Sequence, residues 1–190
     1  NHGSEKQETL TGRVSSFDGA VWRPARDPQR GADGEGGSFL PAFGDAMSER
    51  LRVPVGLVPI AAGGTSVRQW LPQGDRVKQQ PTTGGMQPVG EGEWESAGNL
   101  FDRFAKRFDA LERRGFRAVL WHQGESDAGQ ARWGYPADRQ ISGAQYTQYM
   151  ERLIRATRSK AGWDIPWCGA LATIHTPTEA PDEEFRSAQR

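Results

Sequence analysis

The sequence predicts an α/β fold built around a parallel sheet, and two observations predict it. Three segments of the 190-residue chain, near residues 39–52, 100–111 and 146–157, carry apolar residues at helical spacing. Each segment is followed within a few residues by a short apolar run. Short β-rich runs that follow helices are typical of βα units, in which the strands pair in parallel.

The helical segments also carry start and stop signals. The first helix is expected over about 39–52, with Ser38 as its N-cap. Its apolar residues are four apart: Phe39, Phe43, Met47 and Leu51. The second helix is expected to close at Gly115, in a left-handed conformation. Its apolar residues are Leu100, Phe101, Phe104, Phe108 and Leu111. The third lies between Ser142 and Gly162. Its inner face comprises Tyr146, Met150, Leu153, Ile154 and Thr157.

The three apolar runs are the expected strands of the sheet. They are VPVGLVPIAA (53–62), FRAVLW (116–121) and IPWCGALATI (165–174). Each is bounded by glycine, proline or polar residues, as strands commonly are. Their order along the chain predicts that they lie side by side in one sheet.

A polar motif stands at the end of each expected strand. These motifs are AAGGTSV (61–67), WHQGESD (121–127) and IHT (174–176). In open α/β sheets the ligand crevice lies outside the carboxyl ends of the strands. The three motifs therefore predict a single site.

Two stretches, residues 72–98 and 127–141, are rich in glycine, proline and polar residues and are predicted to be long loops. Loops of this length in a compact domain commonly carry function. The length of the chain favours one domain over residues 1–190.

Composition excludes several classes of function. Lys plus Arg and Asp plus Glu number 24 each, so the net charge gives no reason to expect nucleic acid or an anionic membrane as a partner. The lone cysteine, Cys168, allows no internal disulfide and no cysteine metal cluster. No apolar run approaches the roughly 18 residues of a membrane span. These features are compatible with any cellular compartment.

The motif residues suggest acyl-transfer chemistry. Gly63 and Gly64 leave the backbone bare, so an amide N–H there can approach a ligand closely. Gln123 can place a side-chain N–H in the same crevice. Two such donors form an oxyanion hole, and each is typically worth about 3–4 kcal/mol of barrier. Glu125 and Asp127 are nearby carboxylates that could orient a histidine or accept a proton.

Each of these residues also has a structural interpretation. A double glycine alone is often a tight turn. Gln123 alone would more often be a hydrogen-bonding strand-end residue, and Glu125 and Asp127 would be solvated. His122 should point away from Gln123 on a strand, so it is expected to be structural or to contact a loop. His175 is expected to be a hydrogen-bonded strand-end histidine. Only the combination at adjacent strand ends favours function.

The tryptophans fall into two groups. Trp121 and Trp167 lie in expected strands and are predicted to be core residues. Trp70, Trp94 and Trp133 lie in or beside the long loops, where they could stack on a sugar ring or anchor the loops to the protein.

A competing interpretation makes Ser126 a nucleophile. GESDA (124–128) is similar to the G-x-S-x-G/A elbow of α/β-hydrolases, in which a helix starts directly after the serine. The following Gly129, Gly134 and Pro136 are poor helix formers. Ser126 is therefore a weak candidate.

Three stretches carry a family resemblance. They are SFLPAFGDAMSERLRVPVGLVPIAAGGTSVRQWLP (38–72), VLWHQGESD (119–127) and EFRSAQR (184–190), the last with an Arg-x-x-Gln segment. Together they closely resemble the sialate O-acetylesterase and acetylxylan esterase group of the SGNH (GDSL-like) hydrolase superfamily, carbohydrate esterase family 6. The resemblance implies a flavodoxin-like three-layer sandwich with a parallel sheet.

The resemblance also implies roles for residues. Gly64, or its neighbour Gly63, would be the backbone oxyanion donor, and Gln123 would replace the asparagine that supplies the side-chain donor in other SGNH enzymes. Glu125 would be either the acid of the triad or a structural anchor. The implied enzyme is a serine-type carbohydrate O-acetyl esterase that needs no metal or organic cofactor, and its partner is an acetylated carbohydrate. Secretion or a periplasmic location would suit such an enzyme.

Two family blocks are not found in these residues. The serine of a G-Q-S-N-like block and the histidine of a late D-x-x-H motif are both absent. We therefore expect residues 1–190 to be an internal portion of a longer enzyme, without the nucleophile strand and the histidine segment, and unstable alone. The alternative is a non-catalytic carbohydrate-binding or scaffold domain with the same fold.

Overall fold

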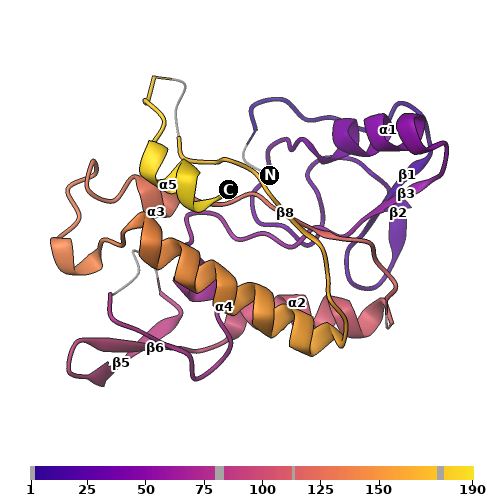
Figure 1. Cartoon of the computed structure of the whole chain (residues 1–190). Coiled ribbons are helices and arrows are strands. Elements are labelled where there is room, and N and C mark those ends of the chain that lie inside the picture. Colours follow the sequence, from indigo (N-terminus) through magenta and orange to yellow (C-terminus); the bar gives the residue numbers. More distant parts are fainter. Residues whose placement is uncertain (1–2, 80–83, 113, 175–177) are drawn as a thin grey trace. The chain divides into compact units, whose positions relative to one another are not determined.

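The computed structural model shows a mixed α/β fold (Figure 1). The chain divides into two compact units. Unit 1 comprises residues 1–63 and unit 2 residues 64–190. The structure describes residues 3–79, 84–112, 114–174 and 178–190. The expectation of one domain over 1–190 stays a prediction.

Unit 1 is a three-stranded sheet covered by one helix. Its elements are β1 (Val14–Phe17), β2 (Trp22–Pro24), α1 (Leu40–Leu51) and β3 (Val55–Leu57). β1 pairs antiparallel with β2 and parallel with β3, and α1 packs on β1 and β3. The core of this unit is apolar: Val14, Ala25 and Leu57, with Leu40, Phe43 and Val55 against them.

Asp45 of α1 fixes the chain that precedes β1. Its carboxylate accepts hydrogen bonds from the hydroxyls of Thr9 and Thr11, both at 2.6 Å, and from the backbone N–H of Leu10 at 2.8 Å. Burial by itself would raise the pKa of Asp45, but these hydrogen bonds outweigh it and lower the pKa to about 2.

Asp45→Asn should therefore reduce stability in a pH-dependent way. The folded pKa lies below the unfolded value of 3.8, so the carboxylate stabilises the fold above pH 3.8 and loses this effect as the pH falls through about 2. Near pH 7 the wild type should exceed the variant by about 2 kcal/mol in the free energy of unfolding. Urea titrations from pH 7 to pH 2 measure the difference. A difference that stayed constant over that range would contradict the assignment.

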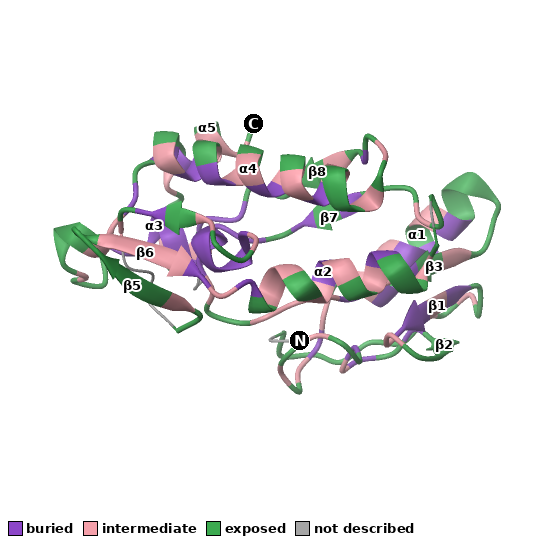
Figure 2. Ribbon diagram, turned by 90° about the horizontal axis from the view of Figure 1, so that it is seen from below, coloured by how far each residue is buried: buried purple, intermediate pink, exposed green. Residues whose placement is uncertain are grey.

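Unit 2 contains two long helices and two parallel strands. The helices are α2 (Asn99–Ala110) and α4 (Gly143–Ala161), which contact each other, and the strands are β7 (Val119–Trp121) and β8 (Trp167–Gly169). Figure 2 shows buried and exposed residues recurring along both helices, as the apolar spacing predicts. The other elements are η1 (Val67–Trp70), β4 (Arg76–Val77), β5 (Met86–Gly90), β6 (Glu93–Ser96), α3 (Glu125–Ala128), η2 (Ala137–Arg139) and α5 (Glu183–Ala188).

Aromatic rings form the core between η1, α2 and the β7–β8 pair. Trp70 meets Trp121 edge to face with ring centroids 5.4 Å apart, and it meets Phe104 at 5.5 Å. Trp167 lies 5.6 Å from Trp121. Because Trp121 is the last residue of β7, this packing holds the end of the strand that leads into the candidate site.

The structure confirms the α/β class and the three predicted helices, but it corrects the strand pairing. β3 pairs with β1 in unit 1, while β7 pairs with β8 in unit 2, so the expected strands belong to two separate sheets. Residues 72–98 are not a loop only, because they form the antiparallel sheet β4–β6–β5. Residues 127–141 include the end of α3 and the single turn η2.

Two cap predictions are also wrong. The N-cap of α1 is Phe39 and not Ser38, whose hydroxyl instead donates to Asp27 at 2.6 Å. After α2, Glu112 and Arg114 adopt the left-handed conformation, whereas Gly115 has no positive φ. Gly115 is required for another reason, since a Cβ there would overlap the carbonyl oxygen of Leu111. The prediction for α4 is confirmed: Ser142 accepts from the N–H of Gln145, and Gly162 is the left-handed C-cap.

Candidate functional site

The GGTS turn leads into η1. Gly63 is the last residue of unit 1 and Gly64 the first of unit 2. Gly64 is exposed with a φ of +67°, and no heavy atom lies within 4 Å of the position that its Cβ would occupy. Ser66 then caps η1 in a capping box with Gln69, whose side chain accepts from the N–H of Ser66 at 2.8 Å. The backbone at Gly64 is thus exposed, and the capping box at Ser66 stabilises the chain that follows it.

The QGESD turn follows β7 directly. Gly124 has a φ of +151°, and a Cβ there would overlap both the carbonyl oxygen of Ala172 and the carboxamide of Gln189. Only glycine fits a backbone this close to a neighbouring strand end. The sharp turn places Glu125 at the start of α3 and turns Asp127 toward the protein interior, where it is 1% exposed.

Gln123 joins the two turns. Its Nε2 donates to the carbonyl oxygen of Thr65 at 3.0 Å and to the Oδ2 of Asp127 at 2.7 Å. Its Oε1 accepts from the hydroxyl of Tyr146 at 3.2 Å. Burial raises the pKa of Tyr146 far above the usual value of a phenol, so this hydroxyl stays protonated and keeps its donor role. The carboxamide of Gln123 is therefore fully engaged within the chain.

Asp127 is the centre of this network. Its Oδ1 accepts from the hydroxyl of Ser66 at 2.6 Å, and its Oδ2 accepts from the N–H of Val67 at 2.9 Å as well as from Gln123. The guanidinium of Arg68, whose side chain is fully buried, lies 3.7 Å from Oδ1. Burial lowers the pKa of Arg68 and the Asp127 carboxylate opposes this, so the two charges support each other away from water.

The end of the third predicted strand reaches the same place. The Nε2 of Gln189 donates to the carbonyl oxygens of Gln123 and Ala172, both at 3.1 Å. The structure thus brings together the GGTS turn, the QGESD turn and the chain beyond β8. His175 lies outside the described residues.

The remaining candidates are placed less centrally. Glu125 keeps a quarter of its side chain exposed, and its Oε1 lies 3.9 Å from the Nε2 of His122, a surface contact. His122 is exposed while Gln123 is buried, as expected of neighbours on opposite sides of a strand end. Ser126 is 9% exposed in a helix of only four residues.

The tryptophan predictions separate clearly. Trp70 is only 3% exposed and its Nε1 donates to the hydroxyl of Thr65, which fits the alternative in which it anchors the chain; its contact with a sugar stays a prediction. Trp94 is half-buried in β6, and Trp133 is 38% exposed with its ring 6.4 Å from that of Tyr135. Trp94 and Trp133 therefore remain candidates for sugar contact.

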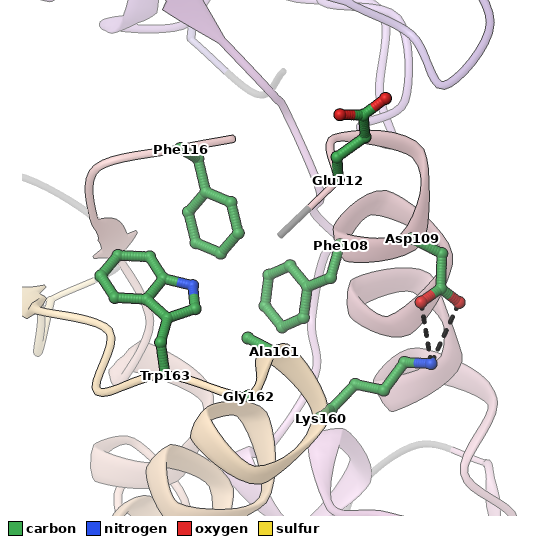
Figure 3. A pocket seen from close by; sticks show the side chains of 8 residues that line it. All are labelled: Phe108, Asp109, Glu112, Phe116, Lys160, Ala161, Gly162 and Trp163. Carbon is green, nitrogen blue, oxygen red and sulfur yellow. Dashed lines mark hydrogen bonds and ion pairs between the residues drawn. The ribbon is translucent and has the colours of Figure 1, made fainter. Parts of the chain in front are cut away.

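A pocket of about 290 Å³ lies elsewhere in unit 2, where the chain enters β7 and β8 (Figure 3). Its lining consists of Phe108, Asp109, Glu112, Phe116, Lys160, Ala161, Gly162 and Trp163. The rings of Phe108 and Phe116 stack on each other with centroids 4.9 Å apart, and Asp109 pairs with Lys160 at 2.9 Å. The QGESD turn stands at the opposite end of β7, so this pocket is not part of the candidate site.

No metal centre emerges from the described ranges: no group of three or more His, Cys, Asp and Glu side chains is placed to hold an ion. In the same part of the chain, no helix combines the length and the apolar character that crossing a membrane requires.

Comparison with known families shows to which family the chain belongs. Residues 4–190 match the family described as "Carbohydrate esterase, sialic acid-specific acetylesterase". The chain belongs to this carbohydrate esterase family. The family does not favour the alternative in which Ser126 is the nucleophile of an α/β-hydrolase elbow.

Similar proteins occur among curated sequences and among solved structures. A probable carbohydrate esterase from Arabidopsis thaliana is 31% identical over 123 residues, which are 62% of this chain and 34% of that protein. The chain therefore spans about a third of the length of this curated relative. An X-ray structure of an Arabidopsis thaliana protein has a TM-score of 0.63 at 24% identity, covering 94% of this chain and 63% of the other. The crystal structure of a carbohydrate acetylesterase from Xanthomonas citri has a TM-score of 0.57 at 17% identity, with 94% and 39% covered.

Sequence reasoning missed several members of the network around Asp127. Ser66 carried a usable signal, since Ser66 and Gln69 have capping-box spacing. Tyr146 looked like one more residue on the apolar face of a helix. Arg68 gave no signal, because nothing in a sequence shows that an arginine between Val67 and Trp70 is buried beside a carboxylate.

Proposed function

We propose that the protein is a carbohydrate O-acetyl esterase that removes acetyl groups from a polysaccharide or glycan by a serine-hydrolase mechanism. The observation that carries the proposal is the hydrogen-bonded junction between the GGTS and QGESD turns, with the bare backbone of Gly64 exposed beside it. Membership of a carbohydrate esterase family supports the same chemistry, as do the names of its relatives, a probable carbohydrate esterase and a carbohydrate acetylesterase.

In this proposal a serine and a histidine outside residues 1–190 supply nucleophile and base. The serine oxygen attacks the acetyl carbonyl carbon while the histidine takes the hydroxyl proton, and the carbonyl oxygen becomes negatively charged. The N–H of Gly64, or of Gly63, donates to that oxygen. Gln123 serves as second donor by turning one N–H from the carbonyl of Thr65 to the substrate, while its bond to Asp127 remains. Collapse of the intermediate breaks the bond to the sugar oxygen, which takes the proton from the histidine; water then hydrolyses the acetyl-serine ester and releases acetate.

Glu125 and the loop tryptophans have supporting roles in the proposal. Glu125 holds the QGESD turn or orients the histidine base. Trp94 and Trp133, one in each of the two long segments, contact the sugar ring through their aromatic faces. O-acetylated sialic acid and acetylated xylan are the two substrate classes to compare.

Turnover of p-nitrophenyl acetate by the full-length protein, with and without a serine-directed phosphonate, tests the proposal. We expect phosphonate-sensitive hydrolysis, followed by release of acetate from one of the two glycan classes. Glycan binding without any inhibitable turnover would reject the esterase and indicate a carbohydrate-binding domain instead.

A further inference from the structure

We propose that the buried pair Arg68–Asp127 is a positioning device with two separable tasks. Asp127 sets the direction of the Gln123 carboxamide, and Arg68 holds the two long segments that flank the site. This inference rests on the proposed function, because it assigns a task to residues around the oxyanion donors. Neither residue is expected to touch the substrate.

The first task follows from the bonds at Asp127. A carboxylate has acceptors only, and here it receives N–H and O–H donors from Ser66, Val67 and Gln123 at 2.6–2.9 Å. Ser66 and Val67 belong to the GGTS side and Gln123 to the QGESD side. One carboxylate therefore sets both donor-bearing turns relative to each other.

The second task follows from where Arg68 reaches. Its Nη1 donates to the carbonyl oxygen of Gln79 at 3.0 Å and to that of Arg139 at 3.1 Å. Gln79 lies in the segment that includes the β4–β6–β5 sheet, and Arg139 is the last residue of η2, within the 127–141 stretch. Its Nε donates to the Ser66 hydroxyl at 2.8 Å. The guanidinium spreads its donors over Nε and Nη1, whereas a lysine carries all its donors on one nitrogen and cannot occupy both positions.

Arg68 and Asp127 are both buried charges, so each depends on the other for stabilisation. Arg68 is 0% and Asp127 1% exposed. A buried charge that loses its partner is costly, so neither side chain can turn away without disturbing the other. The pair is thus a rigid link between the donors and the sugar-facing segments, in place of a flexible surface contact.

The two tasks predict different kinetic changes. Asp127→Asn replaces an acceptor oxygen by an NH2 that faces other donors, so kcat should fall about tenfold or more with KM little changed, because the donor geometry is lost. Arg68→Lys keeps a positive charge beside Asp127 but abandons the two carbonyls, so KM should rise about tenfold with kcat nearly retained. Kinetics should be measured with an acetylated glycan on the full-length protein.

The exposed ion pair Arg158–Asp164, near the end of α4, provides matched controls. The Nε of Arg158 lies 2.9 Å from the Oδ1 of Asp164 and donates to the carbonyl oxygen of Ile165 at 3.0 Å, and 40% and 86% of the two side chains are exposed. Asp164→Asn and Arg158→Lys make the same chemical changes outside the buried network and outside the two long segments, so kcat and KM should stay within about twofold of the wild type.

Purely structural roles predict another outcome. If kcat and KM per folded molecule stayed at the wild-type values in both variants, the positioning proposal would be overturned. Should Asp127→Asn fail to fold, Ser66→Ala removes one bond at Asp127 and should still lower kcat about threefold or more. An unchanged kcat in folded Ser66→Ala would count against the proposal in the same way.

A readout without catalysis separates this inference from the esterase proposal. The backbone amide of Val67 should be protected from hydrogen exchange in the wild type and should exchange faster in Asp127→Asn. Faster exchange in a protein without esterase activity would support the link at Asp127 while rejecting the esterase. Unchanged protection would overturn the role of Asp127 even in an active enzyme.

Discussion

Gly124→Ala is expected to lower the free energy of unfolding by about 3 kcal/mol or more, because two penalties combine. The φ of +151° is a conformation that residues with a Cβ rarely adopt. The added methyl group would also overlap the carbonyl oxygen of Ala172 and the carboxamide of Gln189, which bonds to both strand ends. The QGESD turn and the chain beyond β8 would have to separate.

Urea denaturation measures this effect, and Gly134→Ala is its control. Gly134 also has a positive φ, +73°, but no heavy atom lies within 4 Å of its Cβ position. Its replacement should cost only about 1 kcal/mol, the price of the left-handed backbone alone. Equal losses in the two variants would show that the close approach at Gly124 contributes nothing.

Gln123→Ala should reduce kcat about 100-fold or more in the full-length protein, if Gln123 provides an oxyanion donor as proposed. The loss has two sources. The donor itself disappears, and the carboxylate of Asp127 and the carbonyl of Thr65 lose the N–H groups that they now accept. KM should change much less, since the donor acts mainly on the charged intermediate.

Gln140→Ala is the matched control for this variant. The Gln140 side chain also donates to a backbone carbonyl, that of Tyr135, but it is not part of the Asp127 network. Its kcat should remain within about threefold of the wild type, because a loop hydrogen bond of this kind contributes about 1 kcal/mol to stability. Near-wild-type turnover of folded Gln123→Ala would exclude the donor role.

The helices and the meeting of the motifs could be predicted from sequence, because both follow from local rules. Residues four apart defined α1, α2 and α4, and Ser142 and Gly162 marked the ends of α4. The GGTS and QGESD turns meet as predicted, through Gln123 and Asp127, although β3 and β7 belong to separate sheets and the single sheet assumed in that prediction is wrong. The roles of Gly64, Gln123 and Glu125 stay proposals, because neither a pattern nor a static contact shows catalysis.

Other features depend on contacts between segments far apart in the sequence. The β4–β6–β5 sheet was missed because β5 is a mostly exposed strand without alternating apolar residues. It contains Pro88, and glycines flank it on both sides. Trp70 looked like a loop residue, yet its ring fills the space between Phe104 and Trp121. Such burial is decided by partners that no local pattern reveals.

Gln189 also has a consequence for the synthesis of the protein. Its carboxamide is the group that fastens the chain beyond β8 to the end of β7, and it stands 66 residues after Gln123. When the ribosome has synthesised the chain up to the end of α4, Gln189 has therefore not yet been added. Because a chain folds as its residues emerge, the bonds from Gln189 to the carbonyls of Gln123 and Ala172 form only after α5 has left the exit tunnel.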